Sequence, residues 1–148
     1  MSPPAAFLGA LVAQQALHFL LPGPRIAPVP LQALGLAVAM GGALLHGRAA
    51  RHFKRRGAPL ATLEAPDGLV TDGPFRWSRN PMYLGAVLIL AGIALLYGTL
   101  SPWLVPPAFA VVAARRFILP EERLLSERLG EPYRLYRSTV GRWLGRAR

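Results

Sequence analysis

The chain contains no cysteine among its 148 residues. This absence excludes disulfide bonds, metal sites built from thiolates and a cysteine nucleophile. Acidic residues are scarce as well, with 7 Asp and Glu against 17 Lys and Arg, which gives a formal net charge of +10. Charges of either sign are missing from residues 1–24, 26–47 and 82–114. The chain is nevertheless 53% hydrophobic, and this combination with strong basicity is unusual for a soluble domain.

The three uncharged stretches predict membrane spans, because apolar runs near or above about 18 residues are typical of transmembrane helices. The first two predict spans at residues 5–21 and 30–46. The third is too short for two full spans of about 20 residues each. It predicts a hairpin of two short or tilted helices that turns near residues 98–102, with room for a cavity at its cytoplasmic end. We therefore expect four membrane crossings.

The basic residues predict the orientation of these spans. Apart from Arg25 they lie in residues 48–79 and 115–148, which also hold all the acids. By the positive-inside rule, both segments and both termini are predicted to be cytoplasmic. A pI near 11.5 also suits nucleic acid. Because the charges flank the spans, however, we expect membrane lipids as partners and no nucleic acid.

The composition also bears on the source of the chain. Sixteen Arg against one Lys, with abundant Ala, Gly and Pro, favours a bacterium with a GC-rich genome. We accordingly expect a multi-pass protein of a bacterial inner membrane. No small-residue repeat is specific enough to assign an oligomeric state.

We predict one all-α domain over residues 1–148. Its parts are the first two spans (1–47), a cytoplasmic loop (48–81), the helical hairpin (82–119) and cytoplasmic C-terminal helices (120–148). The loop begins as a basic helix extension and becomes irregular from Gly57, with a short extended piece at residues 69–71. After Pro120, residues 121–129 form an amphipathic helix that Gly130 stops, and Pro132 starts a second short helix.

Small and polar residues within the first two spans predict how the helices meet. Gly35 and the pair Gly41-Gly42 allow close approach of a neighbouring helix. Polar side chains in a span are expected to face other helices rather than lipid. In the first span these are Gln14, Gln15 and His18.

The turn before the third span concentrates polar groups. Asn80 is a preferred N-cap and Pro81 suits the first helical position, so the simplest interpretation is a cap. The free N–H groups of the same helix start also suit an anionic group of a ligand. Arg76 and Arg79 either reach lipid phosphates or bind a carboxylate or phosphate.

Two acidic and two aromatic residues follow near the C-terminus. Glu121 and Glu122 either begin a helix, where acids favour the dipole, or supply a carboxylate to a ligand cation or hydroxyl. Tyr133 and Tyr136 fall on one helix face. They form either an interfacial aromatic belt or the wall of a cofactor or lipid pocket.

These motifs resemble, in order and spacing, the isoprenylcysteine carboxyl methyltransferase family and its relatives among membrane phospholipid methyltransferases. The resemblance covers roughly residues 68–140. The matching pattern is Gly73-Pro74-Phe75-Arg76-x-x-Arg79-Asn80-Pro81-x-Tyr83-x-Gly85, then Glu121-Glu122-x-x-Leu125 and Leu129-Gly130-Glu131-x-Tyr133-x-x-Tyr136. Prenylcysteine enzymes usually have His where Asn80 stands, and often Arg-Val-Pro where residues 139–141 read Thr-Val-Gly. Phospholipid-methylating relatives do use Asn.

The resemblance implies a multi-span helical methyltransferase that binds S-adenosylmethionine on the cytoplasmic side, with no metal. Its acceptor is a lipidic or amphiphilic molecule, such as a lipophilic small molecule or a lipidated substrate, that carries a carboxylate or an amine. For an amine, the candidate proton acceptors are Glu121, Glu122 and Tyr83. The cofactor-binding residues implied by position are Gly73, Pro74, Arg76, Arg79, Asn80, Pro81, Tyr83, Gly85, Glu121, Glu122, Tyr133 and Tyr136.

Two other functions remain open at this point. Membrane reductases of the sterol-reductase type share a similar Arg-x-x-Arg-Asn-Pro-x-Tyr turn but use NADPH, and they are usually much longer. A non-enzymatic membrane scaffold would use the same motifs only to cap helices and to hold lipid head groups.

Overall fold

The computed structural model describes residues 2–55 and 69–146, and over these ranges the chain is helical without a strand. The predicted basic extension of the second span is confirmed to Arg55, whereas the part of the predicted loop from Gly57 to Gly68 lies outside the described residues. The elements are α1 (Pro3–Leu20), α2 (Val29–Arg55), η1 (Gly73–Arg76), α3 (Pro81–Tyr97), η2 (Ser101–Leu104), α4 (Val105–Ala113), η3 (Ala114–Ile118), α5 (Leu119–Leu129) and α6 (Glu131–Thr139).

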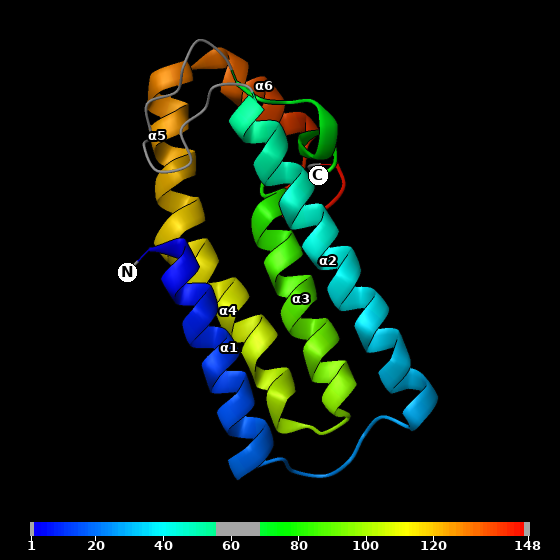
Figure 1. Ribbon diagram of the computed structural model, residues 1–148. Coiled ribbons are helices and arrows are strands. Elements are labelled where there is room, and N and C mark those ends of the chain that lie inside the picture. Colours follow the sequence, from blue (N-terminus) through cyan, green and yellow to red (C-terminus); the bar gives the residue numbers. More distant parts are fainter. Residues whose placement is uncertain (1, 56–68, 147–148) are drawn as a thin grey trace.

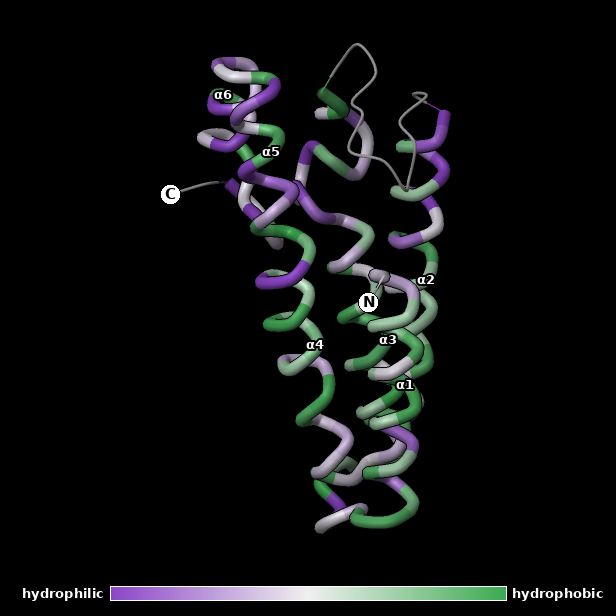
Figure 2. Tube along the Cα trace, turned by 90° about the vertical axis from the view of Figure 1, so that its left-hand side faces the viewer, coloured by the Kyte–Doolittle hydropathy of each residue, from purple (hydrophilic) through white to green (hydrophobic). Residues whose placement is uncertain are grey.

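The helices α1 to α4 run up and down side by side (Figure 1). The α1–α2 and α3–α4 connections meet at the lower end, where the backbone amide of Ile26 donates to the carbonyl of Gly98 at 2.8 Å and that of Leu100 to Pro24 at 3.1 Å. At the opposite end lie η1, α5 and α6 (Figure 1). Figure 2 shows that hydrophilic residues gather at this α5–α6 end and hydrophobic residues along the helix shafts.

Two helical stretches among the described residues are long and apolar enough to cross a membrane, Val29–Arg55 and Ser101–Leu129. The helix α3 is apolar but has only 17 residues. Large apolar side chains are also exposed on the outside of the bundle; Phe19 and Leu20, for example, are 74% and 76% exposed. Such exposure is unfavourable in water but not in lipid. The count of four crossings stays a prediction.

The helices α2 and α3 approach closely through glycines, as predicted for Gly35 and Gly42. A Cβ atom on Gly35 would lie 2.6 Å from the carbonyl oxygen of Gly92, and one on Gly42 would lie 2.7 Å from that of Gly85. Neither glycine can therefore carry a side chain without separating the helices. The prediction is wrong for Gly41, which is exposed and has no atom of another element within 4 Å of a would-be Cβ.

Polar residues hold α1 against the hairpin. Gln14 is fully buried, and its Nε2 donates to the Leu90 carbonyl at 2.8 Å. The ring of His18 stacks on Tyr97 with the centroids 3.8 Å apart. The prediction that Gln15 also faces a neighbouring helix is wrong, because Gln15 is exposed. These contacts fix the lower half of the bundle, where the predicted turn at residues 98–102 is confirmed and Gly98 adopts φ +66°.

The helix predicted at residues 121–129 is confirmed as α5, but it does not start anew after Pro120, because one helical run extends from α4 through α5. The backbone widens into a π-helical stretch, Ala114–Ile118, immediately before Pro120. Proline lacks an N–H and its ring clashes with the carbonyl four residues earlier, here that of Arg116. A wider turn relieves this clash without ending the helix. The run therefore carries α5 straight out of the apolar part of the bundle to the α5–α6 end.

Candidate functional site

The turn before α3 is fastened to the end of α2. Gly73 begins η1 with φ +59°, which favours glycine, and Pro74 follows as the second residue of η1. The Nε2 atom of His52 lies 2.9 Å from the Oδ1 atom of Asp72, and Phe75 is buried with its ring centroid 5.9 Å from that of Phe53. These contacts set the position from which the chain runs on to Arg79.

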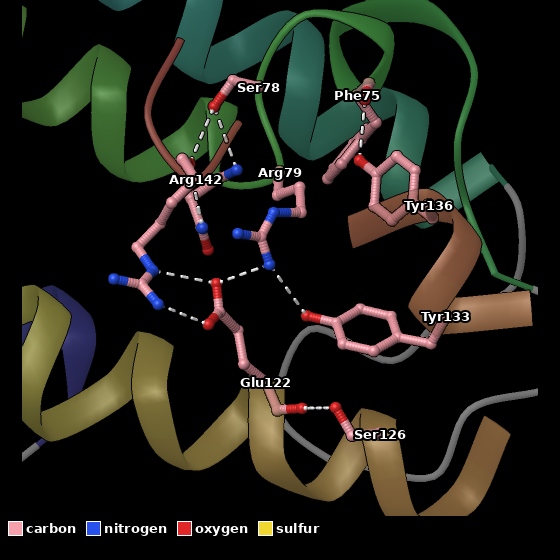
Figure 3. A network of polar contacts seen from close by, with 9 residues as sticks. Phe75, Ser78, Arg79, Glu122, Ser126, Tyr133, Tyr136 and Arg142 are labelled. Carbon is pink, nitrogen blue, oxygen red and sulfur yellow. Dashed lines mark hydrogen bonds and ion pairs between the residues drawn. The ribbon is translucent and has the colours of Figure 1, made fainter. Parts of the chain in front are cut away.

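The centre of the site is an ionic cluster of Glu122 with Arg79 and Arg142, here called the Glu122 cluster (Figure 3). Arg142 donates through Nε and Nη2 to the two carboxylate oxygens at 3.0 and 2.8 Å. Nη1 of Arg79 lies 2.9 Å from Oε1 of Glu122. The side chains of Arg79 and Glu122 are only 8% and 7% exposed, against 34% for Arg142. A buried carboxylate is therefore held between two guanidinium groups from distant parts of the chain.

The charges of the Glu122 cluster act on its neighbours. The hydrogen bond to Glu122 raises the pKa of Arg142. Burial, and next the Glu122 carboxylate, raise the pKa of the Tyr133 phenol, whose oxygen lies 3.5 Å from Nη1 of Arg79. Nε of Arg79 is buried and has no hydrogen-bond partner among the described residues. Because an unsatisfied buried donor is costly, this atom is a candidate contact for an acceptor group of a ligand.

The C-terminal segment, residues 140–146, folds back over the turn and completes the frame. The amide of Arg79 donates to the Gly141 carbonyl at 3.0 Å, and the amide of Gly145 donates to the Trp77 carbonyl at 2.9 Å. Nδ2 of Asn80 donates to the Arg142 carbonyl at 3.1 Å. These hydrogen bonds connect Arg79 and Asn80 to the segment that carries Arg142, the second arginine bound to Glu122.

The predicted N-cap position of Asn80 is confirmed, but the capping hydrogen bond of its side chain does not form. Asn80 occupies the N-cap position of α3, but its side chain makes no capping hydrogen bond; its Nδ2 atom donates instead to the Arg142 carbonyl. Within the described part of the chain, the N–H groups of Met82 and Tyr83 consequently have no acceptor. Unpaired N–H groups at a helix start form a positive end that suits an anion.

The two tyrosines of α6 are not an interfacial belt, because Tyr133 and Tyr136 are 2% and 8% exposed. They pack with Val140, Leu125 and Leu69. The Tyr136 hydroxyl donates to the Phe75 carbonyl at 2.7 Å, and burial raises the pKa of this phenol. No strand forms at residues 69–71, so the predicted extended piece is not paired in the described structure. The tyrosines hold α6 against η1 and place Tyr133 beside Arg79.

Tyr136→Phe is expected to lower the free energy of unfolding more than Tyr133→Phe does. The first change leaves the buried Phe75 carbonyl without its donor, which costs about 1 to 3 kcal/mol, whereas the second removes only a long contact of 3.5 Å. Denaturant titrations of both variants in detergent measure the difference. Equal destabilisation by the two changes would contradict this account of how α6 is held.

Glu121 is the neighbour of Glu122 in the chain, but within the described structure it is not paired with Arg79 or Arg142. Its carboxylate has no hydrogen bond or ion pair among the described residues, and it lies near enough to Tyr83 to act on it electrostatically. The Tyr83 ring is parallel to that of Phe117, with the centroids 6.1 Å apart. Neighbouring helical residues point about 100° apart, so the two adjacent acids serve different surroundings. Glu121 belongs to the face between α3 and the α4–α5 run.

The residues singled out in the sequence thus fall into separate groups. Arg79, Glu122 and Tyr133 lie together, and Asn80 joins them through Arg142, which the motif pattern had not assigned a role. Arg76 is exposed and outside the group. The others line the turn or pack between helices. Gly73 lies against His52, Pro74 follows it in η1, Pro81 is buried at the start of α3, and Gly85 packs on Gly42 and His46.

A hollow adjoins the Glu122 cluster between α5 and α6, with a volume of about 320 Å³. Glu122 and Ser126 line it from α5, and Arg137 from α6. The Ser126 hydroxyl is turned into its own helix, where it donates to the Glu122 carbonyl at 2.7 Å (Figure 3). The hollow therefore presents the backbone side of Glu122, while the carboxylate points to the two arginines.

Over the described residues, fold and site define a helical membrane protein with a buried ionic cluster at one end of its bundle. Residues 30–132 match the phospholipid methyltransferase family, and the chain belongs to that family. An uncharacterized protein from Haemophilus influenzae is 38% identical over 63 residues, which are 43% of this chain and 100% of that protein. Membership in the family makes this chain a membrane methyltransferase. The matched region includes Arg79 and Glu122 but ends before Tyr133, Tyr136 and Arg142.

Proposed function

We propose that the chain is an integral membrane methyltransferase that uses S-adenosylmethionine to methylate a lipidic or amphiphilic acceptor with a carboxylate or an amine. The observation that carries the proposal is the Glu122 cluster, which joins the turn before α3 to α5 by a buried ion pair of 2.9 Å. A methyltransferase has to align its two reactants away from water. A rigid, largely buried polar wall at one end of an apolar bundle is suited to that work.

The residues present fit the chemistry of the proposed cofactor. S-adenosylmethionine supplies an electrophilic methyl group on a cationic sulfonium, and it also carries an amino group and a carboxylate. In this proposal the carboxylate is bound by Nε of Arg79 and the free N–H groups at the start of α3, which lack other partners in the described chain. Glu121 provides a carboxylate for the cationic groups, and Tyr133 lines the wall beside Arg79.

The two glutamates have different roles in the proposal. Glu122 is a positioning residue, because its oxygens already accept from Arg79 and Arg142. Glu121 has no such partner and lies near Tyr83, so it is the proton acceptor when the acceptor is an amine. A carboxylate acceptor needs no base, and Glu121 then only binds and orients.

The acceptor is proposed to enter sideways from the bilayer. In both views α1 begins well below the α5–α6 end (Figures 1 and 2), so α1 leaves that end of the bundle uncovered. The proposed passage lies between α3 and the α4–α5 run, beside Tyr83 and Phe117. Such a route admits a molecule with an apolar tail whose reactive group stays at the membrane surface.

We also propose the orientation predicted by the basic residues. The chain crosses the bacterial inner membrane four times, with both termini and the site on the cytoplasmic side. This topology is supported by the up-and-down course of α1 to α4, with both connections at the end opposite the site. With four crossings, the water-soluble cofactor would reach the site from the cytoplasm, and the lipid-borne acceptor would reach it from the bilayer.

Calorimetric titration of the purified protein in detergent tests the proposal. We expect micromolar binding of S-adenosylmethionine and of its demethylated product, in the common range for substrates, and none of NADPH. Glu121→Gln is expected to weaken binding at least about tenfold, a loss of ~1.4 kcal/mol, and to leave the unfolding midpoint unchanged. Glu131→Gln, at a carboxylate that is 69% exposed, serves as the control. Binding of NADPH alone would instead support a reductase.

A further inference from the structure

A groove of about 690 Å³ runs along the second half of α2, on a set of residues separate from the Glu122 cluster. One wall is α2 itself, and the other is η1 with the residue that follows it. The side chains that matter here are those of Leu44, Leu45, Arg48, Arg51, Arg55 and Trp77, which define the α2 groove.

The α2 groove changes from apolar to basic along its length. Leu44, Leu45, Arg48, Arg51 and Arg55 recur at spacings of one, three or four residues, so they share one face of α2. The leucines lie toward the middle of the helix and the arginines toward its end at η1. A membrane helix with this gradient places the leucines at acyl-chain depth and the arginines at the level of the head groups.

The positive charge of the α2 groove is not neutralised within the described protein. Arg48, Arg51 and Arg55 make no ion pair there, and Nε of Arg51 only donates to its own helix, at the Gly47 carbonyl. Asp72, immediately before η1, lies against His52. Trp77 is 73% exposed beside the arginines. Indole rings prefer the boundary between acyl chains and head groups, so the groove joins three kinds of lipid contact.

We infer that the α2 groove binds one anionic phospholipid of the surrounding leaflet. The arginines hold its phosphate and charged head group, Trp77 lies against its glycerol region, and Leu44 and Leu45 contact an acyl chain. Charge complementarity identifies the occupant, because three arginines without an ion pair among the described residues favour an anionic head group over a zwitterionic one. The inference depends on the membrane position of α2 and not on methyl transfer, and this lipid is not the methyl acceptor.

Trp77 fluorescence in bilayers tests the inference. The protein used is Trp103→Phe/Trp143→Phe, which leaves Trp77 as its only tryptophan; Nε1 of Trp103 has no partner to lose. Phosphatidylglycerol with brominated chains is compared with equally brominated phosphatidylcholine. We expect half-maximal quenching at a mole fraction at least about fivefold lower for phosphatidylglycerol, which is the contribution of one basic residue near an anionic surface. Equal quenching by the two lipids overturns the inference.

Two charge-matched variants show where the preference arises. Arg48→Gln/Arg51→Gln/Arg55→Gln is expected to lose it. Arg115→Gln/Arg116→Gln/Arg134→Gln, at exposed positions outside the groove, is expected to keep it. Loss of the preference in both variants would assign it to overall charge and contradict the inference. If the unaltered groove loses its preference for phosphatidylglycerol when inorganic phosphate is added, the inference is contradicted as well, because the groove would then be a site for soluble anions. If the groove variant does not fold, the comparison of the two lipids in the unaltered groove still decides.

Discussion

Glu122→Ala is expected to abolish cofactor binding and methyl transfer and to lower the free energy of unfolding by about 3 to 5 kcal/mol, the range for breaking a buried ion pair from one side. The physical reason is that Arg79, only 8% exposed, keeps its charge without the carboxylate that neutralises it. Arg142 is 34% exposed and can turn to water, so it adds less to the loss. Denaturant titration and calorimetry in detergent measure the two effects.

A paired substitution separates the structural part of this loss from the functional part. Arg79→Met/Glu122→Met removes both buried charges, and such apolar replacements are often neutral or stabilising. We expect this variant to regain at least about half of the lost stability while it still fails to bind the cofactor. Glu131→Ala, at an exposed carboxylate, should change neither quantity. Restored binding in the double variant would show that the cluster is not part of the cofactor site.

Gly42→Leu is expected to prevent stable packing of α2 on α3, with poor recovery of folded protein and no activity. A Cβ atom at this position would lie 2.7 Å from the Gly85 carbonyl oxygen and 2.8 Å from the Ile89 amide, both of them backbone atoms. Backbone cannot move aside as a side chain can, so the helices have to separate. Overpacking of well-packed interiors typically costs about 1 to 3 kcal/mol, and leucine exceeds the available space by several atoms.

The neighbouring residue provides the control for this prediction. Gly41→Leu adds the same side chain one position earlier, where no atom of another element lies within 4 Å of a would-be Cβ. We expect this variant to unfold at the same temperature as the parent protein. Thermal unfolding followed by circular dichroism compares the two. If both variants lose stability equally, the effect comes from leucine at this depth of the helix and not from the α2–α3 contact.

Charge patterning was sufficient to predict most of the helices. Stretches without charge located α1, α2 and the α3–α4 hairpin, because burying charge in apolar surroundings is costly at any position. Gly98 and the prolines that follow it located the turn of the hairpin, since local conformational preferences act over a few residues. The continuity of α4 with α5 was missed because Pro120 is usually a boundary signal. Only the backbone shows that a wider turn accommodates it.

The partners within the site were harder to predict, because they are chosen over long distances along the chain. Asn80 had a sufficient local explanation as a cap, and nothing nearby indicated that its amide would bond to Arg142, 62 residues away. Which of Glu121 and Glu122 is paired depends on the rotation of α5 relative to Arg79 and Arg142, and two adjacent residues in a sequence do not show that rotation. The family resemblance assigned Asn80, Glu121 and Glu122 to one site. Their different contacts in that site become visible only in the packed structure.

The π-helical stretch Ala114–Ile118 allows the rotation of α5 about its axis to be set independently of the rotation of α4. An α-helix turns about 100° with every residue, so one residue more or fewer normally rotates everything that follows it. A wider turn absorbs an additional residue, so that α4 keeps its packing against α1 and α3 while α5 still presents Glu122 to Arg79. In evolutionary terms, this stretch can accommodate a single-residue insertion or deletion between α4 and α5 without rotating Glu122 away from Arg79.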